Sequence, residues 1–281
     1  MWFFTLLGSH SWIRGNNFVR FAIKKHVEPK QRYFIKLAYK GTNYHGWQVQ
    51  PNAITVQHIF NQALSTVLRE DIHAMGAGRT DTGVHASCFW AHFDVQHPIE
   101  DPEKIRFRLN RYLPDDIAVY GIFPVHEKAH ARFDALSRTY NYQITRIKDP
   151  FRREFAYFVF WELDMDRMNK ACQLLKEYKD FSSFSKAQTQ TKTNLCDIYK
   201  AHWKRDGHLL IFTIQANRFL RNMVRAIVGT MIEIGQGRLR PDDLHSIIQS
   251  KNRSEAGYSV PANGLYLAQI NYPEALDLQR Y

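Results

Sequence analysis

Cysteine is scarce in this chain of 281 residues, and so are long apolar runs. The three cysteines, Cys88, Cys172 and Cys196, lie far apart and form no C-x-x-C pair, which argues against a disulfide framework and a zinc knuckle. Such usage is typical of a reducing compartment, so we expect a cytoplasmic protein. No apolar run is long enough to cross a bilayer, and the opening MWFFTLLGSHSW is a poor match to a secretory signal. We therefore expect no membrane partner.

Acidic residues are also few: 27 against 38 lysines and arginines, a formal net charge of +11 with histidine neutral. This surplus favours a polyanionic partner over an acidic small molecule. Aromatic residues make up 14% of the chain, and on a basic surface such side chains can stack on nucleic-acid bases. The 44% apolar content is that of a folded protein with a sizeable core.

The first half of the chain predicts strands that alternate with helices. Residues 1–30 read as a loosely held leader. After it, apolar periodicity predicts strands over 32–41, 88–95 and 116–125, and helices over 55–70 and 101–114. Thr55 is the expected N-cap of the first helix.

The second half has a similar mixture. We expect strands over 137–147, 196–207, 208–217 and 264–272, and helices over 164–181, 218–237 and 240–250. The sequence therefore predicts an α+β fold, with two related α/β halves at 31–130 and 131–275. Because no low-complexity linker divides them, we expect one shared, mainly antiparallel sheet flanked by helices, with an active-site cleft between the halves.

The stretch GAGRTDTGVHA, residues 76–86, concentrates glycine around a single carboxylate. Its glycines permit tight turns that bring Arg79 and Asp81 close to a ligand. The pattern is neither a Walker loop nor a Rossmann turn. One carboxylate does not suit a glycosidase, which needs two, or two-metal phosphoryl transfer, which needs several acidic ligands. It suits a nucleophile or proton acceptor that works alone, while an Asx-turn with an exposed arginine is the structural alternative.

The same stretch closely resembles the active-site signature of the TruA family of tRNA pseudouridine synthases. Further blocks occur in that family's order and span residues 32–273: YKGTNYHGWQVQP, FDALSRTYNYQI, KDFSSFSK, RFLRNMVRAIVGTM and VPANGLYLAQINYP. The resemblance implies isomerisation of uridine to pseudouridine in the anticodon arm of tRNA, at nucleotides 38, 39 and 40. It also implies a homodimer that needs neither a metal nor a cofactor.

The resemblance assigns roles to individual residues. Asp81 is implied to be the essential aspartate, which attacks C6 of uracil or C1′ of the ribose, or removes a sugar proton. Arg225 is implied to pair with Asp81 and keep it ionised. Tyr140 is implied to pack against the target base, and Leu265 to line the uracil pocket. Arg79 is implied to help turn the base out of its stack.

Two other functions stay open at this point. A tRNA-binding protein or chaperone without turnover would have the same basic charge, but the intact set of matched site residues argues against it. A metal-dependent nuclease would use Asp81 with His85 and His92, and chelators would abolish its activity.

Basic residues along the chain are candidates for contacts with RNA phosphates. Those we expect to serve in this way are Lys24, Lys25, Lys30, Lys40, Arg106, Arg108, Arg111, Lys186 and Lys192. Arg221, one turn before Arg225 in the expected helix, is expected at the surface.

Overall fold

A computed structural model describes residues 30–186 and 193–278. Most of the expected leader lies outside these residues, and so do three of the candidate lysines, Lys24, Lys25 and Lys192. The strands are β1 (Gln31–Tyr39), β2 (Met75–Gly76), β3 (His85–Val95), β4 (Ile117–Val125), β5 (Ser137–Thr145), β6 (Tyr157–Phe158), β7 (Ile198–Asp206), β8 (Leu209–Ala216) and β9 (Leu265–Asn271). Every expected strand is present, and the short β2 and β6 are additions.

These strands form one sheet in the order β4-β1-β3-β9-β5-β8-β7, with β2 beside β3 and β6 beside β5. Most neighbours are antiparallel, which confirms the expected α+β class. The last strand in sequence, β9, lies in the middle of the sheet and pairs in parallel with the start of β3, where His85 faces Tyr266. The two halves therefore share one sheet, as expected, and β9 joins them.

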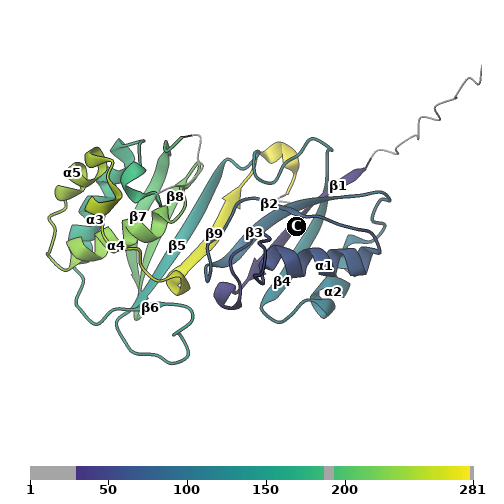
Figure 1. The fold of residues 1–281 in the computed structure, drawn as a ribbon, viewed down its shortest axis with the longest axis horizontal. Coiled ribbons are helices and arrows are strands. Elements are labelled where there is room, and N and C mark those ends of the chain that lie inside the picture. Colours follow the sequence, from purple (N-terminus) through teal and green to yellow (C-terminus); the bar gives the residue numbers. More distant parts are fainter. Residues whose placement is uncertain (1–29, 187–192, 279–281) are drawn as a thin grey trace, which may run out of the picture.

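Helices cover both ends of this sheet. They are α1 (Val56–Leu68), α2 (Pro102–Tyr112), α3 (Met165–Leu174), α4 (Met223–Gly235) and α5 (Asp243–Ser250). In Figure 1, α1 and α2 lie at the end that holds β4, whereas α3, α4 and α5 gather at the end that holds β7 and β8. Thr55, the expected cap of α1, accepts a hydrogen bond from the His58 N–H at 3.4 Å. Asp101 and Asp164 cap α2 and α3 in the same way.

All five helices are shorter than the sequence predicts, and two of them differ by more than three residues at one end. The helix expected over 218–237 begins only at Met223, because Asn222 adopts a left-handed conformation with φ of 67° and breaks the helical path. The helix expected to reach Phe181 ends at Leu174, where a 3₁₀ turn follows and the chain bends to bury the Phe181 ring. Burial of an aromatic side chain outweighs the continuation of the helix there.

Two hydrophobic cores lie along the sheet, one in each half of the chain, and each core also contains residues from the other half. Leu267 and Ile270 of β9 belong to the core of the N-terminal half, whereas Val84, just before β3, belongs to the core of the C-terminal half. The Tyr140 ring packs against both cores. The halves are thus interlocked around residues 80–86, while their exact limits at 31–130 and 131–275 stay a prediction.

His92 makes the stability of this fold depend on pH. Its side chain is buried in β3, its Nδ1 accepts a hydrogen bond from the Ala131 N–H at 3.1 Å, and burial lowers its pKa from 6.5 to about 4. Between those values the unfolded chain binds a proton that the folded chain does not, so the free energy of unfolding falls as pH drops from about 6.5 to about 4. His92→Asn, which keeps an acceptor near Nδ1, is expected to flatten this slope in urea unfolding.

A matched substitution at the exposed turn residue His208 serves as the control for the histidine experiment. His208→Asn should leave the pH slope as it is in the unaltered protein. His85, His130 and His202 also have lowered pKa values from burial, so the His92 variant removes only part of the slope. Equal slopes in the His92 and His208 variants would contradict the assignment.

Candidate active site

Asp81 lies in the loop of residues 77–84 between β2 and β3, which we call the Asp81 loop. Main-chain contacts define its shape: the Val84 N–H donates to the Asp81 carbonyl at 3.1 Å, and the Trp47 N–H donates to the Thr80 carbonyl at 3.4 Å. Because the Asp81 backbone rather than its carboxylate closes the turn, the side chain is left for other contacts. This arrangement differs from the Asx-turn that was the structural alternative.

The Asp81 carboxylate is 27% exposed, and its Oδ1 lies 3.5 Å from Nε of Arg221. Arg225 instead donates from Nε to the Val260 carbonyl at 2.6 Å, so among the described residues the ion pair of Asp81 is with Arg221. The late start of α4 at Met223 explains this, because Arg221 stands in the turn before the helix. Arg221 is 60% exposed, at the surface as expected. The role implied for Arg225 stays a prediction.

Tyr140 lies on β5 between the two cores, with its ring edge-on to Phe219 at a centroid distance of 5.1 Å. Burial raises the pKa of Tyr140 to about 12; the Arg138 charge works against this rise, and the Asp81 charge adds to it. The hydroxyl therefore stays protonated at neutral pH, close enough to feel the Asp81 charge. It can donate a hydrogen bond inside the site, which an ionised phenolate cannot do.

The other two predicted site residues differ in exposure. Arg79 is exposed in the Asp81 loop and has no carboxylate partner within the described residues. Leu265, the first residue of β9, is 5% exposed and packs in the core of the C-terminal half. The structure thus places Asp81 and Tyr140 together, keeps Arg79 at the rim of the same loop, and buries Leu265.

The two histidines of the metal-nuclease alternative are held by the backbone. Nδ1 of His85 accepts from the Gly41 N–H at 3.0 Å, and its Nε2 lies 2.9 Å from the Glu154 carbonyl. Since a carbonyl only accepts, Nε2 carries the proton and neither ring nitrogen offers a free lone pair to a cation. His92 likewise uses Nδ1 to accept from Ala131. This donor set does not fit a metal site built on Asp81, His85 and His92.

Arg138 is a contact of the site that the sequence reasoning missed. Its Nη2 donates to the carbonyl of Ala77, at the start of the Asp81 loop, at 3.0 Å. The signal was available in principle, because Arg138 precedes Tyr140 by two residues on a strand and so shares its face. Nothing in the sequence shows, however, that Ala77 would pass above that face.

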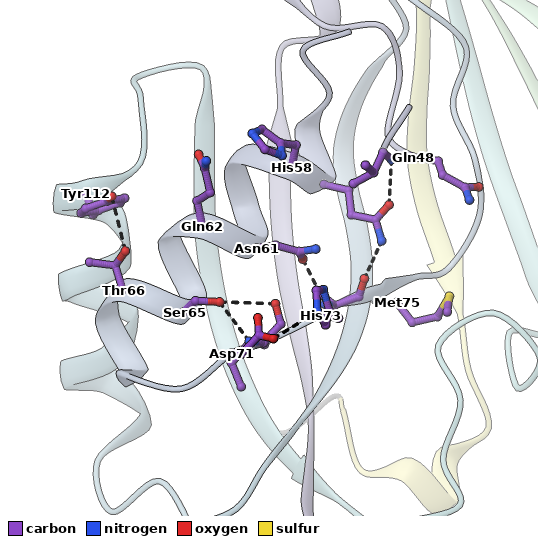
Figure 2. A pocket seen from close by; sticks show the side chains of 14 residues that line it. Gln48, His58, Asn61, Gln62, Ser65, Thr66, Asp71, His73, Met75 and Tyr112 are labelled. Atoms are coloured by element: carbon purple, nitrogen blue, oxygen red, sulfur yellow. Dashed lines mark hydrogen bonds and ion pairs between the residues drawn. The ribbon is translucent and has the colours of Figure 1, made fainter. Parts of the chain in front are cut away.

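A pocket of about 830 Å³ opens beside α1, and Figure 2 shows the polar side chains that line it. Two of them tie residues 71–75 to the helix: Asn61 accepts from the Ala74 N–H at 3.0 Å, and Gln57 donates to the Ala74 carbonyl at 2.7 Å. Because this segment continues through β2 into the Asp81 loop, these bonds help to fix the position of the chain just before the loop. None of the predicted site residues lines the pocket.

Asp81 is thus a single enclosed acid near the middle of a shared α+β sheet, beside a protonated tyrosine. A carboxylate in such surroundings is able to serve as a nucleophile or a base, and the class of protein that this arrangement favours is an enzyme. Residues 30–186 and 193–278 contain no group of three or more His, Cys, Asp or Glu side chains that could hold a metal ion. In the same residues, no helix is long and apolar enough to pass through a membrane.

Comparison with known proteins narrows this class. The family model described as tRNA pseudouridine synthase matches residues 36–134 and 171–273. A protein of Bacteroides fragilis named tRNA pseudouridine synthase A is 53% identical over 247 residues, which cover 88% of this chain and 98% of that protein. Its namesake in Thermoanaerobacter pseudethanolicus is 38% identical over 240 residues, 85% of this chain and 98% of that protein. The chain therefore belongs to the tRNA pseudouridine synthase family, whose members are isomerases.

Proposed function

We propose that the protein isomerises uridine to pseudouridine at nucleotides 38, 39 and 40 of the tRNA anticodon arm, with Asp81 as the essential nucleophile or base. The observation that carries the proposal is the carboxylate of Asp81, largely enclosed and next to the protonated Tyr140 and the cationic Arg221. Relatives named tRNA pseudouridine synthase A, at about half identity, support tRNA as the substrate.

The reaction exchanges one bond to C1′ for another. The N1–C1′ bond of uridine breaks, the freed uracil turns, and a C5–C1′ bond forms. C5 then loses its proton to solvent, and N1 takes up a proton from solvent, so the product is an isomer of the substrate. An ionised carboxylate can assist by adding to C6, by adding to C1′, or by removing a sugar proton, and each route uses one acid only. No redox step occurs, so the balance of atoms requires no co-substrate.

The remaining residues have distinct parts in this proposal. Tyr140 packs against the uracil and offers its hydroxyl proton as a hydrogen-bond donor. Arg79, exposed at the rim, helps to turn the nucleotide out of the stack and occupies its place. Leu265 lines the apolar side of the uracil pocket. Arg225, whose Nε donates to the Val260 carbonyl, keeps Asp81 ionised through its positive charge.

In this proposal, basic side chains outside the site also contact the phosphates of tRNA. Arg108 and Arg111 on α2 are exposed and have no carboxylate partner in the described chain, whereas Arg106 pairs with Glu103 and Lys40 with Glu154. The unpaired cations are the better phosphate contacts, because no carboxylate has to be displaced. A non-catalytic tRNA-binding protein or chaperone would use the same surface, and it is the second candidate.

Tritium release from tRNA labelled at C5 of uridine tests the function. Transcripts with uridine at only one of nucleotides 38, 39 and 40 should each release tritium, and a transcript with cytidine at all three should not. Release should be the same with EDTA present. Tight binding without release would favour the binding protein, and release from the triple-cytidine transcript would contradict the proposed positions.

We propose further that the protein is a cytoplasmic homodimer. Large aromatic side chains stand out of the surface at Phe151, Phe160 and Trp161, with exposed fractions of 88%, 78% and 56%, and a partner subunit would cover such area. Light scattering of the purified protein should give twice the mass of one chain. A monomeric mass at assay concentration would contradict the dimer without affecting the proposed reaction.

A further inference from the structure

Arg138 places its guanidinium against four backbone carbonyls. Nη2 donates to Ala77 at 3.0 Å and to Arg132 at 2.7 Å. Nη1 donates to Asn217 at 2.9 Å and to Ala135 at 3.2 Å. Within the described residues this arginine has no ion pair with a carboxylate, so backbone carbonyls are the hydrogen-bond acceptors that face its charge. A planar fork of five N–H groups suits such an arrangement, and a lysine does not reproduce it.

Sheet formation does not require this side chain. The backbone of Arg138 pairs with Ala216 of β8 on one side and with Ile270 of β9 on the other. Burial lowers the pKa of Arg138, which shows that enclosing the cation works against its charged state. A buried charge without an acidic partner is unfavourable for stability unless other contacts offset it. The four carbonyl contacts therefore offset the cost of enclosing the Arg138 cation.

The four carbonyls come from three separate segments, two of which border the site. Ala77 begins the Asp81 loop, and a second segment, 130–136, supplies two carbonyls. The third segment, 217–222, carries both Arg221, which is paired with Asp81, and Phe219, which packs on Tyr140. One side chain thus links the segment that holds Asp81 to the segment that holds its partner.

We propose that Arg138 is a positioning residue, which sets the Asp81 loop and the segment 217–222 at the separation where Asp81 meets Arg221 and Tyr140. It touches neither the reacting base nor the Asp81 carboxylate, and it acts through backbone carbonyls of both segments. This inference rests on the proposed function, because its consequence is a rate of isomerisation.

Arg138→Ala is expected to lower kcat at saturating tRNA at least about tenfold, since small displacements of a reacting group have effects of this size. The Kd for tRNA should stay within about twofold, because phosphate contacts elsewhere dominate the affinity. Guanidinium ion at millimolar concentration should restore part of the lost rate, because it can donate to the same carbonyls. Tetramethylammonium, which has no N–H donor, should restore none.

Arg32→Ala is the matched control. Arg32 is another partly buried arginine; it donates to the Ala129 carbonyl at 2.8 Å and pairs with Asp94, but it touches neither the Asp81 loop nor the segment 217–222. Its loss should lower the melting temperature and leave kcat unchanged. A second variant, Arg138→Lys, keeps the charge with a single nitrogen, and its kcat should also fall while its melting temperature stays closer to that of the unaltered protein.

A kcat for Arg138→Ala equal to that of Arg32→Ala would overturn the proposal, as would equal rescue by guanidinium and tetramethylammonium. If Arg138→Ala does not fold, Arg138→Lys decides: a kcat equal to that of the unaltered protein overturns the positioning role, and a reduced kcat with unchanged tRNA affinity supports it. An unaltered protein that releases no tritium is a different failure, because it overturns the proposed function and this inference with it.

Discussion

Asp81→Asn is expected to lower tritium release from C5-labelled tRNA by at least about 10³-fold, within the range of effects seen when a general base or nucleophile is removed. Asparagine has nearly the same shape, but it cannot carry negative charge or accept a proton at neutral pH. The fold should persist, because the ion pair with Arg221 is partly exposed and the Asp81 backbone closes the turn. Circular dichroism and tRNA affinity should both stay near those of the unaltered protein.

Two further variants separate charge from position. Asp81→Glu keeps the carboxylate but moves it by one methylene group, so a large loss of kcat is expected there too. Asp71→Asn, at a side chain that is 86% exposed before β2, should have full activity. Turnover of Asp81→Asn within tenfold of the unaltered protein would show that another group carries the chemistry.

Much of the fold follows from local sequence. Apolar periodicity predicted the long strands of the sheet, and Thr55 marked the start of α1 because its side chain can accept a backbone hydrogen bond. The start of α4 did not follow, since it depends on Asn222, whose Nδ2 donates to Ser259 Oγ from a distant part of the chain. Contacts between segments far apart in sequence override helical periodicity at such points.

The site was partly predictable for a similar reason. Asp81 stood out because a lone carboxylate among glycines is a local pattern that a sequence displays. The partner arginine was not local: Arg221 and Arg225 differ by one helical turn, and the start of α4 decides which of them reaches Asp81. The contacts of Arg138 were not predictable, because its four acceptors come from three distant segments. The sequence thus identifies the carboxylate, whereas the residues that pair with it and hold its loop depend on tertiary structure.

Gly46→Ala is expected to destabilise the protein by at least about 2–4 kcal/mol and to reduce activity strongly. Gly46 has φ of 83°, and a Cβ at this position would lie 2.2 Å from the Thr80 carbonyl oxygen. The Thr80 carbonyl oxygen accepts a hydrogen bond from the Trp47 N–H, and Thr80 directly precedes Asp81. Either the Asp81 loop or residues 46–47 must move, and both movements displace the carboxylate. Urea unfolding and tritium release measure the two effects.

Two other glycines divide the expected loss at Gly46 into its causes. Gly207, in the turn between β7 and β8, has φ of 56°, and a Cβ placed there would meet no atom within 4 Å, so Gly207→Ala should lose only the strain of a left-handed residue, about 1 kcal/mol. Gly78 in the Asp81 loop has neither a positive φ nor a close neighbour, so Gly78→Ala should change stability by less than about 0.5 kcal/mol.

The excess loss at Gly46 over Gly207 then measures the close approach between residue 46 and the Asp81 loop. A large excess, together with a fall in kcat, means that close packing against a glycine holds the backbone before Asp81 in place. Equal losses at Gly46 and Gly207 would mean that residues 46–47 move aside for a methyl group and leave the Asp81 loop in place. The hydrogen bond from Arg138 to Ala77 would then hold the loop, and Arg138→Ala would become the more damaging of the two changes.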